Sequence, residues 1–130
     1  MGIAASAIKP PCCSSAQIRL TTASGRLVYT GDFKPRPGLS CETPATRSAE
    51  VLIMETTCGL PRYRFKCDAL FPLSDHADYE DLLRYVEQVS PRIVYTLHGY
   101  AEEFARDLRA RGMEAWSLIS NNQLELPLLL

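Results

Sequence analysis

The sequence is poor in histidine and tryptophan. It contains two histidines and one tryptophan among 130 residues. Its five cysteines are an odd number and form no CxxC pair. That spacing argues against a zinc ribbon or a disulfide framework, and favours a reducing cytoplasm. The formal net charge is -1, so the chain lacks the basic excess expected of a protein that binds nucleic acid by charge alone.

Long apolar runs are also missing. The N-terminal "MGIAASAIKPPCC" has no continuous apolar core of the length that a secretion signal needs, and the tail "LELPLLL" is too short to span a bilayer. Apolar residues nevertheless make up 46% of the chain, and 130 residues suffice for one domain with a real core. These features predict a cytoplasmic globular protein that does not enter membranes.

The first half of the sequence reads as strands and loop. "AQIRLTTASGRLVYTGDF" predicts two strands joined by the turn "ASG". "KPRPGLSCETPATRS" is rich in Pro, Gly, Ser and Thr and predicts a loop. The continuous apolar run in "EVLIMETT" is typical of a strand that is buried on both faces.

The second half alternates helices and strands. "DYEDLLRYVEQV" has apolar residues at helical spacing, with Ser74, Asp75 and Asp78 as candidate caps or first-turn acids. "RIVYTL" predicts a strand, "AEEFARDLRARG" a second amphipathic helix that stops at Gly112, and "EAWSL" a last strand. We therefore expect an α/β fold with parallel pairing and right-handed crossovers. Trp116 and the tyrosines fall at core-like spacing and are expected to pack inside.

Four polar residues stand near the ends of predicted strands. Asp32 follows "LVYTG", Glu55 follows "VLIM", and His76 and His98 each separate an apolar run from a helix. Sites in open α/β sheets form at the carboxyl ends of strands, and carboxylate with imidazole is a ligand set for zinc or manganese. Each residue also has a plainer interpretation, as a turn residue, a strand end or a first-turn helical residue.

Four segments together resemble the metallo-β-lactamase-fold nucleases of the β-CASP group. They are "LVYTGDFKPRPG", "VLIMETTCGLPRYRF", "FPLSDHADYEDLLRYV" and "VYTLHGYAEEFARDLRARGMEAWSL", and they occur in the family's order from about Ser15 onward. The similarity is to bacterial ligase-associated DNA exonucleases and mRNA 3'-end processing factors. It implies an exonuclease-type phosphodiesterase that uses zinc or manganese. It also implies DNA or RNA as the substrate, with DNA favoured, and association with a DNA ligase and helicase system.

The resemblance assigns roles by position. Asp32 matches the aspartate that bridges two metals, and His98 matches a histidine ligand of one metal. Glu55 and His76 match the catalytic residues of the first two β-CASP motifs. Arg62, Arg64 and Lys66 form a basic cluster that could touch phosphates or could be a solvated loop.

The chain also departs from the family pattern. It contains no "HxHxDH" string, Pro11 stands near the place of another metal histidine, and "RYRFKCDALFPLSDHADY" runs through where a cap domain is normally inserted. Cys12 and Cys13 lie near that place, as incidental thiols or as substitute zinc ligands. These departures predict a fragment, either a truncated reading frame or a decayed paralogue. Residues 1–14 would be a divergent segment and 15–130 the second half of the sandwich, joined near 65–70 without the cap.

Several functions stay open at this point. The chain could hold part of a nuclease site and be inactive or incomplete alone. It could be a residual non-catalytic module that binds a partner, or a thioesterase-like or lactamase-like hydrolase of the same fold. Glu55, His76 and His98 occurring together disfavour the last of these. Because the first half of the sandwich is missing, we expect uncovered apolar surface and self-association.

Overall fold

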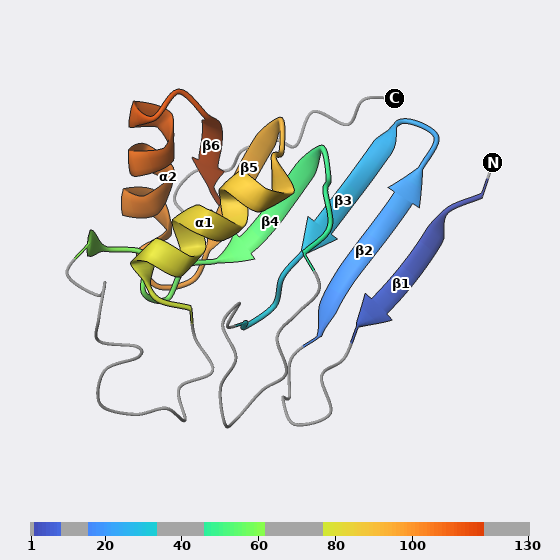
Figure 1. Ribbon diagram of the computed structural model, residues 1–130, viewed down its shortest axis with the longest axis horizontal. Coiled ribbons are helices and arrows are strands. Elements are labelled where there is room, and N and C mark those ends of the chain that lie inside the picture. The colour runs from blue at the N-terminus through green and yellow to red at the C-terminus, as the bar shows by residue number, and fades with distance from the viewer. Residues whose placement is uncertain (1, 9–15, 34–45, 62–76, 119–130) are drawn as a thin grey trace.

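The computed structural model describes residues 2–8, 16–33, 46–61 and 77–118. These residues form six strands and two helices (Figure 1). In chain order they are β1 (Ala4–Ile8), β2 (Gln17–Thr22), β3 (Gly25–Tyr29), β4 (Val51–Glu55), α1 (Tyr79–Val89), β5 (Ile93–Leu97), α2 (Ala101–Ala110) and β6 (Glu114–Ser117).

The six strands form one mixed sheet in the order β1-β2-β3-β4-β5-β6. β1, β2 and β3 pair antiparallel, whereas β3 through β6 run parallel. The expected α/β architecture is therefore confirmed. β1 is an addition, because no strand was predicted within residues 1–14. Its sequence "AASAI" is mostly small residues of low strand propensity. The strand therefore forms because it pairs with β2, not because of its own composition.

Helix α1 begins where the sequence places its cap. The Asp78 carboxylate accepts a hydrogen bond from the Asp81 backbone N–H at 2.9 Å, which satisfies one of the free donors of the first turn. The helix ends at Ser90, which adopts a left-handed φ of 53° and donates its N–H to the Val86 carbonyl. Ser74 and Asp75, the other two candidate caps, lie outside the described residues.

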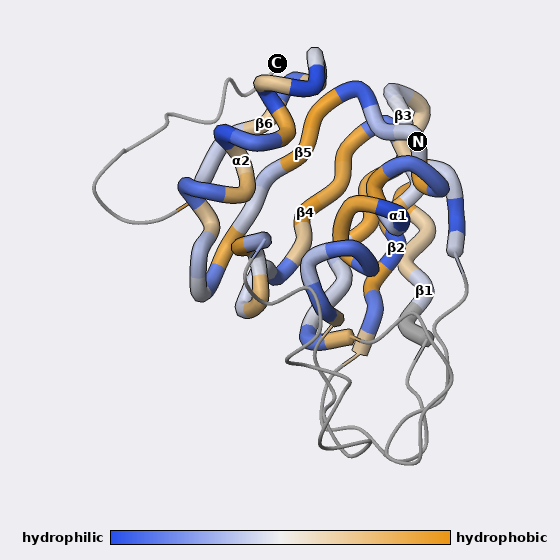
Figure 2. Tube along the Cα trace, turned by 60° about the vertical axis from the view of Figure 1, so that its left-hand side comes forward, coloured by the Kyte–Doolittle hydropathy of each residue, from blue (hydrophilic) through white to orange (hydrophobic). Residues whose placement is uncertain are grey.

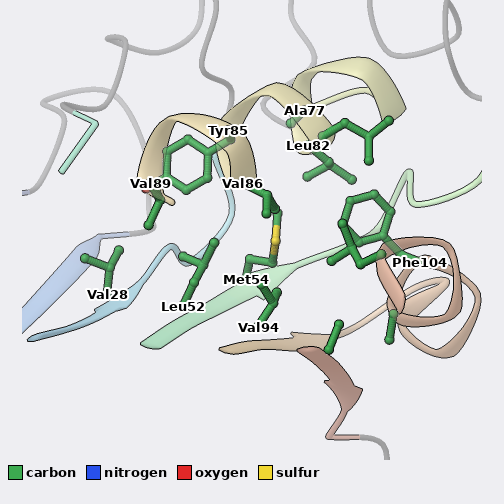
Figure 3. Close-up of a cluster of buried hydrophobic side chains, with 14 of the residues drawn as sticks. Val28, Leu52, Met54, Ala77, Leu82, Tyr85, Val86, Val89, Val94 and Phe104 are labelled. Atoms are coloured by element: carbon green, nitrogen blue, oxygen red, sulfur yellow. The ribbon is translucent and has the colours of Figure 1, made fainter. Parts of the chain in front are cut away.

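Both helices cover the same face of the sheet. Val28, Leu52, Met54 and Val94 point from the strands toward α1 (Figure 3), and all four are at most 1% exposed. Helix α2 joins the same cluster through Phe104, Ala105 and Leu108. The apolar positions at helical spacing in α1 are all buried, as predicted: Tyr79, Leu82, Leu83, Val86 and Val89.

The opposite face of the sheet carries the alternate strand residues. Strand side chains alternate between faces, so Tyr29, Ile53 and Tyr95 project away from the helices, and all three are half-buried. Figure 2 shows β4 and β5 as hydrophobic along most of their length. The apolar side chains of "VLIM" and "LVY" are therefore incompletely covered on one face of the sheet only, because α1 buries those on the other face.

Trp116 corrects an expectation. The sequence assigned it to the core, but its side chain is 42% exposed. Its neighbour Ala115 faces the helices, so Trp116 projects from edge strand β6 on the opposite face. The Arg109 guanidinium lies 5.2 Å from the indole ring centre, a cation–π distance.

A cysteine provides a second correction. The sequence favoured free thiols, yet Cys58 is disulfide-bonded and 8% exposed. The other four cysteines lie outside the described residues. Spacing in the sequence could not predict a bridge, because pairing depends on the Cα separation that the fold creates.

The apolar face leads us to expect self-association of the purified chain. Ile18, on β2, is 38% exposed and lies on this face beside Tyr29. In sedimentation velocity at micromolar concentration, the wild-type chain should form dimers or larger species, and Ile18→Lys should shift them toward monomer. Ala110→Lys, at an exposed position on α2, is the matched control and should leave the distribution unchanged. A compact wild-type monomer would contradict the expectation.

An ion pair fixes the entry to β4 beside β3. Glu50 accepts hydrogen bonds from Arg26 through both carboxylate oxygens, at 2.9 Å from Nη2 and at 2.6 Å from the backbone N–H. Hydrogen bonding by Arg26 lowers the pKa of Glu50 to about 2. The pKa of Arg26 is raised by the same contact.

This pair predicts a small pH dependence of stability. Because the folded-state pKa of Glu50 lies below its ordinary value, the pair stabilises the fold above about pH 4.5, and that contribution is lost as the pH falls toward 2. Thermal melting of Glu50→Gln should therefore fall less steeply than that of the wild type across this window. Both side chains are about one-third exposed (37% and 35%), so the difference should be modest. Parallel melting curves for the two proteins would refute the assignment.

Candidate active site

Asp32, Glu55 and His98 lie at one edge of the sheet. β3, β4 and β5 are parallel, so their carboxyl ends meet there. Asp32 follows β3, Glu55 is the last residue of β4, and His98 directly follows β5. Since β4 lies between the other two, the ends of β3 and β5 are separated by two strand spacings, roughly 10 Å.

The three side chains differ in how far they reach solvent. Asp32 and His98 are exposed, whereas Glu55 is 0% exposed. One carboxylate oxygen of Glu55 accepts the Thr57 backbone N–H at 2.9 Å, and the Glu55 N–H donates to the Thr30 hydroxyl at 3.2 Å. Glu55 is thus a fixed, buried carboxylate, while Asp32 and His98 are exposed residues.

The chain reaches Asp32 through a turn at Gly31. Gly31 has a φ of 59°, a left-handed value that glycine adopts without steric cost. The buried Thr30 hydroxyl donates to the Gly31 carbonyl at 2.7 Å and so holds this turn against β4.

His98 is held in an unusual backbone conformation. Its φ is 63°, and the next residue, Gly99, has a φ of 59°. A Cβ on Gly99 would lie 2.5 Å from the Thr57 Cα, so only glycine fits at this contact. The turn that carries His98 therefore rests directly on the backbone that follows β4.

The described residues do not make a closed metal site by themselves. No group of three or more His, Cys, Asp and Glu side chains in these segments could hold an ion. A catalytic zinc site takes three protein ligands, and the described edge offers two exposed candidates, Asp32 and His98. His76 lies outside the described residues, and so does the basic cluster of Arg62, Arg64 and Lys66.

Two threonines at this edge were missed by the sequence analysis. Thr30 and Thr56 are buried to 1% and 0%, and their hydroxyls bond the backbone on which Asp32 and His98 are mounted. In the sequence, Thr30 stands directly before a turn glycine and Thr56 directly after the acid that ends β4. Neither pattern predicts a contact with a turn that is distant in the chain.

Comparison with known proteins decides the family. Residues 63–118 match the domain family described as "Zn-dependent metallo-hydrolase RNA specificity domain". An "Uncharacterized protein in lig 3'region" of Acidianus ambivalens is 36% identical over 104 residues, covering 78% of this chain and 67% of that protein. The chain belongs to the metallo-β-lactamase family of Zn-dependent metallo-hydrolases.

A second relative is similar to the chain over a shorter stretch. A "Probable DNA ligase" of Opitutus terrae is 67% identical over 64 residues, which are 49% of this chain and 6% of the ligase. The chain thus spans a small part of one curated relative and about two thirds of the other. No solved structure matches. Within the described segments, neither helix is long and apolar enough to cross a bilayer.

Proposed function

We propose that this metallo-hydrolase chain carries part of the site of a metal-dependent nucleic-acid phosphodiesterase of the exonuclease type. The observation that supports the proposal is that Asp32 and His98 lie at the same edge of the sheet, with Glu55 on the strand between them. Carboxylate and imidazole are the ligand types of hydrolytic zinc and manganese sites.

In this proposal Asp32 and His98 are metal ligands, and Glu55 and His76 are the catalytic residues. The two ligands leave an ion with open positions, so a tight site needs further ligands from outside the described residues. The Glu55 carboxylate is buried and held by the Thr57 N–H, so its orientation at the end of β4 is fixed. Arg62, Arg64 and Lys66 would contact phosphates of the substrate.

DNA is the substrate that we favour. One relative is named "Probable DNA ligase" and the other is named for the lig 3' region, which supports association with a DNA ligase. Association with a helicase is part of the same proposal and rests on the family resemblance alone. The name of the matched domain family refers instead to RNA. Parallel assays with single- and double-stranded DNA and RNA distinguish the two.

One observation favours a second candidate for the isolated chain. The sheet face opposite the helices carries the half-buried Tyr29, Ile53 and Tyr95 beside the exposed Ile18. This face is compatible with a non-catalytic α/β module that binds a partner through it. Metal binding at Asp32 and His98 separates the two candidates.

Zinc titration of the labelled chain tests the metal proposal. The chain has two histidines, so the imidazole signals are few and can be assigned by variants. Zinc should shift or broaden the His98 signal, with an affinity in the range of about 10 μM to 1 mM because two protein ligands are available. Asp32→Ala should weaken this response about tenfold, and Glu87→Ala, an exposed acid on α1, should not. An unchanged response in Asp32→Ala would argue against a shared site.

A further inference from the structure

Thr56 stands at the contact between the end of β4 and the turn that carries His98. Its side chain is 0% exposed. Its hydroxyl lies 2.8 Å from the His98 carbonyl oxygen and 3.2 Å from the Leu97 carbonyl oxygen, and it can donate to either. Thr56 also uses both of its backbone polar groups toward this turn. Its N–H donates to the Leu97 carbonyl at 2.9 Å, and its carbonyl accepts the Tyr100 N–H at 3.2 Å.

These contacts surround a strained residue. A non-glycine residue with a φ near 63° is disfavoured by about 1–2 kcal/mol, and it persists only where its surroundings fix it. Thr56 binds the chain before His98, at His98 and after it. Gly99, next in the chain, packs so closely on Thr57 that a Cβ would meet the Thr57 Cα at 2.5 Å. The segment after β4 is therefore a seat that determines the backbone conformation of His98.

We propose that Thr56 is a positioning residue for His98. Its buried hydroxyl, by binding the His98 carbonyl, holds that residue in the left-handed conformation and so sets the direction in which the imidazole leaves the sheet edge. That the positioned group is a metal ligand rests on the proposed function. The contact itself joins residues 42 positions apart and is independent of any metal.

Removal of the hydroxyl should release the turn. Thr56→Val keeps the branched shape but removes the hydroxyl that donates to the His98 carbonyl. His98 should then lose its left-handed conformation. That conformation gives a strong intraresidue NOE between the amide and α protons of His98, so the NOE should weaken in Thr56→Val. Tyr100 keeps its acceptor, the Thr56 backbone carbonyl, but the turn should open more often. Exchange of the Tyr100 amide proton with solvent should therefore accelerate about tenfold, as expected when the turn loses one stabilising hydrogen bond.

Two further variants test whether the effect comes from the Thr56 hydroxyl. Thr56→Ser retains the hydroxyl and should restore the His98 NOE and the slow exchange of Tyr100. Thr57→Val is the same change one residue later, at a half-buried side chain whose hydroxyl makes no hydrogen bond to the turn in the described part of the chain. It should leave His98 as in the wild type. Equal effects of Thr56→Val and Thr57→Val, or no effect of either, would overturn the proposal.

One measurement uses the wild-type chain alone and so does not depend on whether a variant folds. The Thr56 hydroxyl proton should exchange slowly enough with water to be observed, with NOEs to the turn protons at His98 and Gly99. A rapidly exchanging hydroxyl would refute the proposal. Zinc titration of the same samples then separates the two ideas. If zinc leaves His98 unchanged while Thr56→Val still releases it, the metal proposal fails and the positioning contact stands. If zinc shifts the His98 imidazole signal equally in the wild type and in Thr56→Val, the contact has no positioning role.

Discussion

Phe104→Ala is expected to lower the free energy of unfolding by about 3–5 kcal/mol, the range found when a buried aromatic ring is truncated. Phe104 is 0% exposed and belongs to the cluster between the sheet and the helices (Figure 3). Its ring meets that of Tyr79 edge-on, with centres 5.8 Å apart and planes at 88°. The residue therefore ties α2 to α1 as well as to the sheet.

Phe104 also packs against the segment after β4. A Cβ on Gly59 would lie 3.1 Å from the Phe104 Cβ, so the two backbones approach closely at this point. Alanine retains this Cβ, so truncation leaves its cavity where the ring lay, against Tyr79 and between the helices. Urea denaturation followed by circular dichroism measures the effect. Arg106→Ala, at an exposed position of the same helix, should change stability by less than about 0.5 kcal/mol. A loss below about 1 kcal/mol for Phe104→Ala would show that the cluster repacks around the gap.

The helices illustrate what the sequence could predict. The apolar spacing of α1 determined both its extent and its buried face, because one stripe of Leu and Val must pack on something. Asp78 could be named as a cap because the capping interaction is local, reaching only three residues ahead. Gly112, just after α2, has the left-handed φ of 85° that suits a helix stop.

β1 and Trp116 show where prediction failed. The composition of β1 is not that of a strand, and its structure depends on an edge that β2 offers. Trp116 belongs to a short strand whose sequence does not reveal which face of the sheet the helices cover. Both outcomes depend on which element lies next to which, and that information is absent from a short window of sequence.

The candidate site divides in the same way. The positions of Asp32, Glu55 and His98 at strand ends follow from local patterns and from parallel pairing. The seat formed by Thr56 depends on a contact between residues 42 positions apart, and the left-handed φ of His98 has no signature in the sequence. Positioning residues of this kind become visible only when the two loops are brought together.

The isolated chain is expected to show no nuclease activity near ordinary enzyme rates. Hydrolysis by two metal ions needs both ions about 3.5–4 Å apart, so that they clamp the attacking and leaving oxygens. The described residues offer Asp32 and His98, and no three-ligand group. The formal charge of -1 provides no general attraction for a polyanion in place of specific contacts. With weak metal affinity and loose geometry, we expect rates lower by several orders of magnitude than the median turnover of about 10 per second.

Incubation with zinc or manganese and end-labelled DNA and RNA, single- and double-stranded, tests this expectation. Wild-type protein, His98→Ala and Asp32→Ala should give the same background, with Glu87→Ala as the control for purification. Any trace nuclease that copurifies would persist in all four proteins and can be identified by that persistence. Robust cleavage that disappears in both His98→Ala and Asp32→Ala, but not in Glu87→Ala, would contradict the expectation. It would show that the 130 residues complete a metal site with ligands outside the described segments, and that the chain is an enzyme on its own.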